Sequence, residues 1–142
     1  MALPTFGSEL ARPVAAVVAT TFTVIAGFLA FWASGGSWGL CAHWGGAYTV
    51  LPAGLRAMDA VSAALFLAGA LVVLGRAGYW ESGVPIGVLH CGIWAFIVIL
   101  TLSALMNFAS SSRWERFMLG PLAFVLASLC FVVARSPEEA GA

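Results

Sequence analysis

Four polar side chains carry the chemistry that this sequence offers at the ends of its apolar segments: His43, Arg56, Asp59 and Asn107. Charged side chains inside apolar segments are costly in lipid, and they tend to mark ligand or ion paths. Histidine changes its charge near neutral pH, so it binds metals, moves protons or contacts anions. We therefore expect these four residues to contact a small polar ligand or a lipid headgroup.

The same residues also have a structural interpretation. Arg56 and Asp59 are three positions apart, so a helix places them on one face, where they can pair. A carboxylate in the first turns of a helix is stabilised further by the helix dipole. His43 has no second ligand near it in the sequence and fits a solvated interfacial residue. In this interpretation the polar residues form a clamp that holds the preceding loop, and the sequence leaves both interpretations open.

The sequence predicts no metal site, no cofactor and no catalytic role. Cys41, Cys91 and Cys130 show no CxxC spacing and are expected to be small buried apolar residues. Adjacent positions on a helix point about 100° apart, so His90 and Cys91 make a poor chelate. The motifs of serine hydrolases, nucleotide-binding loops and zinc proteases are absent.

The composition indicates which solvent surrounds the protein. Of its 142 residues, 62% are hydrophobic and only 8% are charged, with a mean hydropathy of +1.02. A soluble domain is about 25% charged, so these charges are too few to cover a water-facing surface. The lipid bilayer is therefore the expected surroundings. No basic stripe is present to hold a phosphate backbone, which excludes nucleic acid as an expected partner.

Four apolar segments are long enough to cross a membrane as helices, at residues 14–32, 55–75, 86–108 and 117–134. They predict a single all-α domain over residues 1–142, an integral membrane bundle of four transmembrane helices. The first segment is longer than the apolar core of a signal peptide and is expected to be a retained span. Pro13 and Pro121 are expected in the first turns of the first and fourth helices.

The longest connection, residues 32–52, joins the first two spans. It holds about a third of the glycines, half of the tryptophans and His43. We expect it to cap one end of the bundle, with a short helical turn between Trp38 and Tyr48.

Small residues spaced by four predict the faces through which the helices pack. Close backbone approach drives association in lipid, where burial of apolar area contributes little. The expected packing faces are Ala15, Ala19, Thr23 and Gly27; Ala60, Ala64 and Ala68; Gly87, Cys91, Ala95, Ser103 and Asn107; and Ala123 and Ala127.

The arginines do not decide the orientation in the membrane. Four spans place both termini on one side, and excess Arg and Lys normally mark the cytoplasmic side. Three arginines fall on each side: Arg12, Arg76 and Arg135 against Arg56, Arg113 and Arg116. The default prediction is cytoplasmic termini, and the balanced count also permits dual topology.

Three short stretches resemble a known family. They are FWASGGSWG at residues 31–39, VLP at 50–52 and WERFMLGPLAF at 114–124, and they resemble the DUF3995 family of small four-span bacterial membrane proteins of unknown function. The resemblance implies a four-span fold in the bacterial cytoplasmic membrane and no established activity. The family tends to have a histidine where this chain has Leu29, so no role of that histidine carries over.

These observations favour a non-enzymatic membrane protein that works by helix association, with itself or as an accessory subunit of a membrane-protein partner. The small-residue faces support this function. The alternative is a small-molecule or ion transporter or channel acting as a homo-oligomer. The alternative is supported by the near-interfacial Arg56, Asp59 and Asn107 and by the balanced arginine count.

Overall fold

The computed structural model describes residues 6–137, which are mostly helical, with no strand among them. The four long helices are α1 (Phe6–Ala33), α2 (Ala53–Arg76), α3 (Ile86–Ala109) and α4 (Gly120–Arg135). With the turn that precedes α4, all four are long and apolar enough to cross a membrane. The predicted four-span, all-α architecture is confirmed, and the protein is an integral membrane protein.

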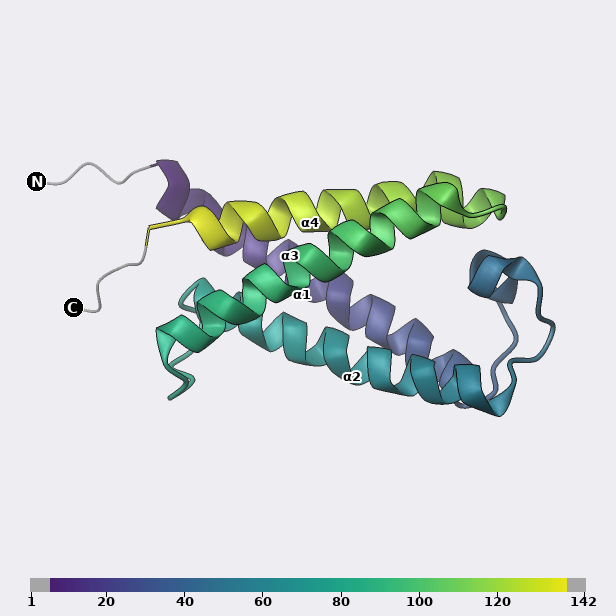
Figure 1. Cartoon of the computed structure of the whole chain (residues 1–142). Coiled ribbons are helices and arrows are strands. Elements are labelled where there is room, and N and C mark those ends of the chain that lie inside the picture. Colours follow the sequence, from purple (N-terminus) through teal and green to yellow (C-terminus); the bar gives the residue numbers. More distant parts are fainter. Residues whose placement is uncertain (1–5, 138–142) are drawn as a thin grey trace, which may run out of the picture.

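The helices form two hairpins, α1 with α2 and α3 with α4 (Figure 1). The beginning of α1 and the end of α4 lie at the same end of the molecule, which places the described ends of the chain together. Towards the other end the two hairpins draw apart, and the loop of residues 34–52 lies there. This 34–52 loop contains two short 3-10 turns, Leu40–Ala42 and Trp44–Gly46, which confirms the expected helical turn.

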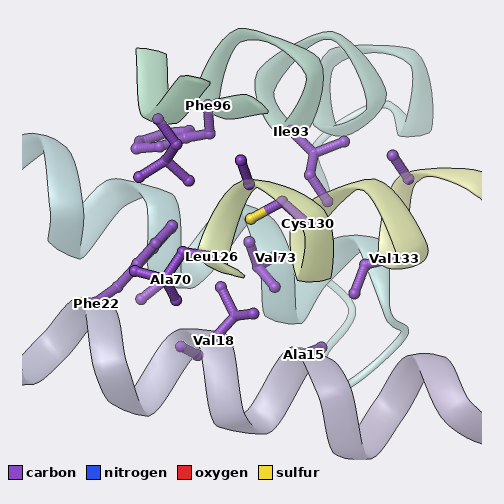
Figure 2. Close-up of a cluster of buried hydrophobic side chains, with 14 residues drawn as sticks. Ala15, Val18, Phe22, Ala70, Val73, Ile93, Phe96, Leu126, Cys130 and Val133 are labelled. Carbon is purple, nitrogen blue, oxygen red and sulfur yellow. The ribbon is translucent and has the colours of Figure 1, made fainter. Parts of the chain in front are cut away.

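The hydrophobic core joins all four helices in the half of the bundle that contains the chain ends. Figure 2 shows its side chains converging from α1, α2, α3 and α4, among them Val18, Val73, Ile93 and Cys130. Phe22 lies in this core, with ring centroids 5.2 Å from Phe66 and 5.5 Å from Phe96. In the half near the 34–52 loop, a smaller buried cluster joins only α1 and α2. The loop half of the bundle is therefore less tightly held together.

Gly69 of α2 lies directly against two aromatic rings of this core. A Cβ added there would lie 2.6 Å from Cζ of Phe96 and 3.0 Å from Cε2 of Phe22. We expect Gly69→Ala to lower the free energy of unfolding by about 1–2 kcal/mol, because overpacking forces the rings to shift. The measurement is an unfolding titration in detergent. The matched control is Gly27→Ala, since no atom lies within 4 Å of a Cβ at Gly27. Equal losses in the two variants would contradict the tight contact.

The predicted packing faces are right for parts of α1 and α4 and wrong for α2 and α3. Ala15, Ala19, Ala123 and Ala127 are buried as expected. The other members point outward or are only half-buried: Thr23, Gly27, Ala60, Ala64, Ala68, Gly87, Cys91 and Ala95 are exposed, and Ser103 and Asn107 are half-buried. The buried face of α2 carries Asp59, Ala63, Ala70 and Val73, and that of α3 carries Ile93, Phe96, Leu100 and Ala104.

The reason is that small residues occur on both faces of α2, so their spacing alone does not select the inner one. On α3 the core is filled by large side chains instead. Of the three cysteines, only Cys130 is buried, whereas Cys41 and Cys91 are exposed. The expectation of three buried cysteines is therefore wrong for two of them.

Two helix boundaries also differ from the expectation. The first helix begins at Phe6, so Pro13 lies inside it rather than in its first turn. The hydroxyl of Tyr79 donates to the carbonyl of Arg12 at 3.0 Å, and the Arg12 guanidinium lies 4.8 Å from the centre of the Tyr79 ring. These contacts attach α1 to the connection that follows α2, at the residue before Pro13.

The fourth helix is preceded by a π-helical turn, Glu115–Leu119. The Gly120 N–H donates to the carbonyl of Glu115, five residues back. Pro121 follows in the first turn of α4, as expected, because it lacks the N–H that an ordinary helical turn would use. Glu115, the first residue of this turn, accepts the N–H of Gly45 in the 34–52 loop.

Candidate functional site

The candidate site is the buried carboxylate of Asp59 beneath the 34–52 loop. Its side chain is 2% exposed, in the second turn of α2. Oδ1 accepts two hydrogen bonds, from Nε2 of His43 at 2.9 Å and from Nε1 of Trp44 at 3.1 Å. Oδ2 has no hydrogen-bond partner among the described residues. One oxygen of this buried carboxylate is thus hydrogen-bonded twice, and the other oxygen has no hydrogen bond within the described residues.

A proton must lie between His43 and Asp59. Unprotonated, Nε2 and Oδ1 are both acceptors, and two acceptors do not approach to 2.9 Å without a shared proton. This is also the one contact between a carboxylate and a basic side chain counted as a salt bridge within residues 6–137, and it is an ion pair only when His43 is protonated. The pair therefore consists either of an imidazole N–H beside a carboxylate or of a carboxylic acid beside a neutral imidazole.

Two indole rings contact the imidazole of His43. Trp32, in the last turn of α1, stacks on it with ring centroids 4.4 Å apart and planes 18° from parallel. Trp44 lies 5.4 Å away at a tilt of 55°. Nε1 of Trp32 donates to the carbonyl of Trp38 at 2.8 Å. The end of α1 thus holds both the first half of the loop and the ring against which His43 rests.

A left-handed turn positions two hydrogen-bond donors of the loop, the indole N–H of Trp44 and the backbone N–H of Gly45. Trp44 has φ 49°, and Gly45 and Gly46 follow with φ 71° and 69°. A left-handed conformation is unfavourable for a residue with a side chain and persists where the surroundings enforce it. In this turn Nε1 of Trp44 meets Asp59, while the backbone N–H of Gly45 points to Glu115.

Glu115 connects the loop to the second hairpin. Its Oε1 accepts the N–H of Gly45 at 2.6 Å, and its Oε2 accepts the hydroxyl of Ser110. Arg116 donates through Nε and Nη2 to the carbonyl of Ser110, at 3.1 and 2.8 Å. Residues 43–45 are therefore held by one carboxylate from each hairpin.

The structure brings together only two of the four candidate residues, His43 and Asp59. Arg56 does not pair with Asp59: its Nε donates to the carbonyl of Ala33 at 2.9 Å, where a cation is favourable at the end of a helix. Asn107 donates to the carbonyl of Ser103 in its own helix at 2.9 Å. Both lie outside the cluster around Asp59, and a ligand role for all four stays a prediction.

Sequence reasoning expected Trp44 to fold over the polar end of the bundle together with His43, but it did not count Trp44 among the site residues, and it missed Glu115. Glu115 is the only acid in the connection between α3 and α4, and that was the available signal. Its partner, Gly45, is 70 positions away, so no local pattern identifies it.

Comparisons with protein-family models, with curated proteins and with solved structures found no match for this chain. The resemblance to DUF3995 therefore stays a prediction. Within residues 6–137, no three His, Cys, Asp or Glu side chains gather where they could hold a metal ion. A carboxylate bonded to an imidazole can hold and move a proton, and a carboxylate beside aromatic rings can hold a cation.

Polar side chains at the opposite end have structural partners. Arg76 is 7% exposed, and its Nη2 donates to the carbonyls of Ala134 and Ser136, at 3.4 and 2.9 Å. It thus stabilises the C-terminal end of α4. Nε1 of Trp94 donates to Nε2 of His90 at 3.0 Å, so this histidine is engaged within its own helix.

A shallow apolar groove of about 410 Å³ lies on the outer face of α1. Its lining is Val24, Gly27, Phe28, Phe31 and Trp38. In a membrane protein such a surface meets lipid chains, and it contains no polar group that would select a solute.

Proposed function

We propose that this protein is a non-enzymatic integral membrane protein that works by helix association, first of all between copies of itself. The observation that carries the proposal is the outward face of α2, where Ala60, Ala64 and Ala68 are exposed. The core of the described chain is complete without them. Small residues on a lipid-facing surface let a second helix approach closely. The resemblance to DUF3995 adds the bacterial cytoplasmic membrane as the location.

The neighbouring residues Ala63 and Ala64 give a matched test of this function, because Ala63 is buried and Ala64 is exposed. We expect Ala64→Leu to leave unfolding within about 0.5 kcal/mol of the wild type, as outward substitutions do. The same variant should weaken association, measured as energy transfer between labelled copies in liposomes. Ala63→Leu should instead lower the free energy of unfolding by about 1–3 kcal/mol through overpacking.

Two outcomes would contradict this proposal. Wild-type copies that show no energy transfer at any protein-to-lipid ratio would exclude self-association. Ala64→Leu copies that associate as strongly as the wild type would exclude this face of α2 as the interface.

A second candidate function is a small-molecule or ion transporter or channel. One observation favours it: Asp59 is buried within an apolar helix, and buried acids in membranes tend to mark ion or substrate paths. Against it, the four-helix core beside the chain ends is filled by apolar side chains, so a path requires the hairpins to part. Uptake of tetraethylammonium into sealed proteoliposomes tests this function, and uptake equal to that of protein-free vesicles would exclude it for this cation.

A further inference from the structure

We propose that Asp59 and the indole rings of Trp32 and Trp44 form a binding site for an organic ammonium cation, and that His43 occupies this site as a built-in ligand. The proposal goes beyond association between copies, which involves the outward face of α2. It also requires no movement of the cation across the membrane.

The first support is charge. Asp59 and Glu115 contact three consecutive loop residues, 43–45, through the bonds described above. The nearby cations Arg56 and Arg116 instead donate to the backbone carbonyls of Ala33 and Ser110. Only His43 is left to neutralise Asp59, whose Oδ2 has no partner within the described chain. A buried unpaired carboxylate oxygen is costly, so the site favours a positive occupant.

The second support is the aromatic surroundings. Trp32 and Trp44 present rings within 4.4 and 5.4 Å of the His43 ring. A cation is attracted to an indole face at distances up to about 6 Å, and aromatic surfaces of this kind recognise substituted ammonium groups. His43 thus occupies the place where a cationic centre would contact both a carboxylate and indole rings. Metal ions fit less well, because calcium requires about six to eight oxygen ligands and zinc about four donors.

The third support is that the present occupant belongs to the loop and not to a helix. His43 has an extended backbone between two 3-10 turns, and its side chain is 18% exposed, against 2% for Asp59. Withdrawal of the His43 side chain alone therefore uncovers the carboxylate for an external cation, while Trp44 keeps its hydrogen bond to Asp59.

The test is a titration of the full chain in detergent micelles with tetraethylammonium chloride, followed by tryptophan fluorescence at constant ionic strength. We expect His43→Ala to bind the probe about tenfold more tightly than the wild type, because a competing internal ligand has been removed. Asp59→Asn should bind it at least about tenfold more weakly, since the charge is lost while the shape is kept.

Trp32→Leu provides a second variant that keeps Asp59, in case Asp59→Asn does not fold. Loss of an indole face should weaken binding by about fivefold. The proposal is overturned if His43→Ala binds more weakly than the wild type, because His43 would then support the site and not compete for it. It is equally overturned if sodium chloride gives the same fluorescence change, or if Trp32→Leu binds as the wild type does.

Discussion

Replacing Asp59 by alanine is expected to release the 34–52 loop from the bundle. The substitution removes the acceptor of two hydrogen bonds, from His43 at 2.9 Å and from Trp44 at 3.1 Å. Hydrogen bonds to a charged group contribute about 1.5–3 kcal/mol each, and removing the carboxylate also removes the cost of burying it. The free energy that keeps the loop closed should fall by about 3 kcal/mol. Hydrogen exchange of the amides of residues 40–46, in detergent or nanodiscs, measures this opening directly.

Asp59→Asn is the control for charge against shape. The asparagine keeps an acceptor oxygen for Trp44 and His43, so exchange should rise by a factor corresponding to about 1 kcal/mol. Equal exchange in Asp59→Ala and the wild type would show that the loop is held without Asp59. In that case the bond from Gly45 to Glu115 would be the main attachment.

The helical architecture could be predicted because it depends on local composition. Each span is a run of apolar residues whose length suits a bilayer, and the observed α2 and α3 end within two residues of the predicted bounds. The start of α1 could not be predicted in this way. Pro13 is a strong local signal for a helix start, yet α1 continues through it, and the preceding residue, Arg12, contacts Tyr79, which is 67 positions away from it.

The candidate site could be predicted only in part, for the same reason. Asp59 and His43 stood out because ionisable groups are rare in this sequence. Which groups meet them depends on the path of the loop, which brings His43 across 16 positions to Asp59. Helix spacing favoured Arg56 as the partner, but the end of α1 offers Arg56 a carbonyl oxygen instead. Whether a side chain bonds a partner near in sequence or a distant one depends on tertiary geometry. The spacing of residues along one helix carries no information about that geometry.

The loop's geometry depends on glycines for two separable reasons. Gly45 and Gly46 both have left-handed backbones, with φ 71° and 69°. A Cβ at Gly45 would meet no atom within 4 Å, whereas one at Gly46 would lie 2.8 Å from the carbonyl oxygen of Cys41. A side chain at either position therefore has the cost of a left-handed backbone. Only at Gly46 would it also collide with the backbone carbonyl of Cys41.

Gly46→Ala is consequently expected to open the loop far more than Gly45→Ala. A left-handed alanine costs about 1 kcal/mol, and the collision adds about 2 kcal/mol because a carbonyl oxygen in a turn has little room to move. Hydrogen exchange of residues 40–46 should show about 3 kcal/mol of loop stability lost in Gly46→Ala and about 1 kcal/mol in Gly45→Ala. Similar losses would mean that Cys41 yields, and that the turn adapts to its side chains. A larger loss in Gly46→Ala would show that the collision with the Cys41 carbonyl, added to the left-handed backbone, opens the loop.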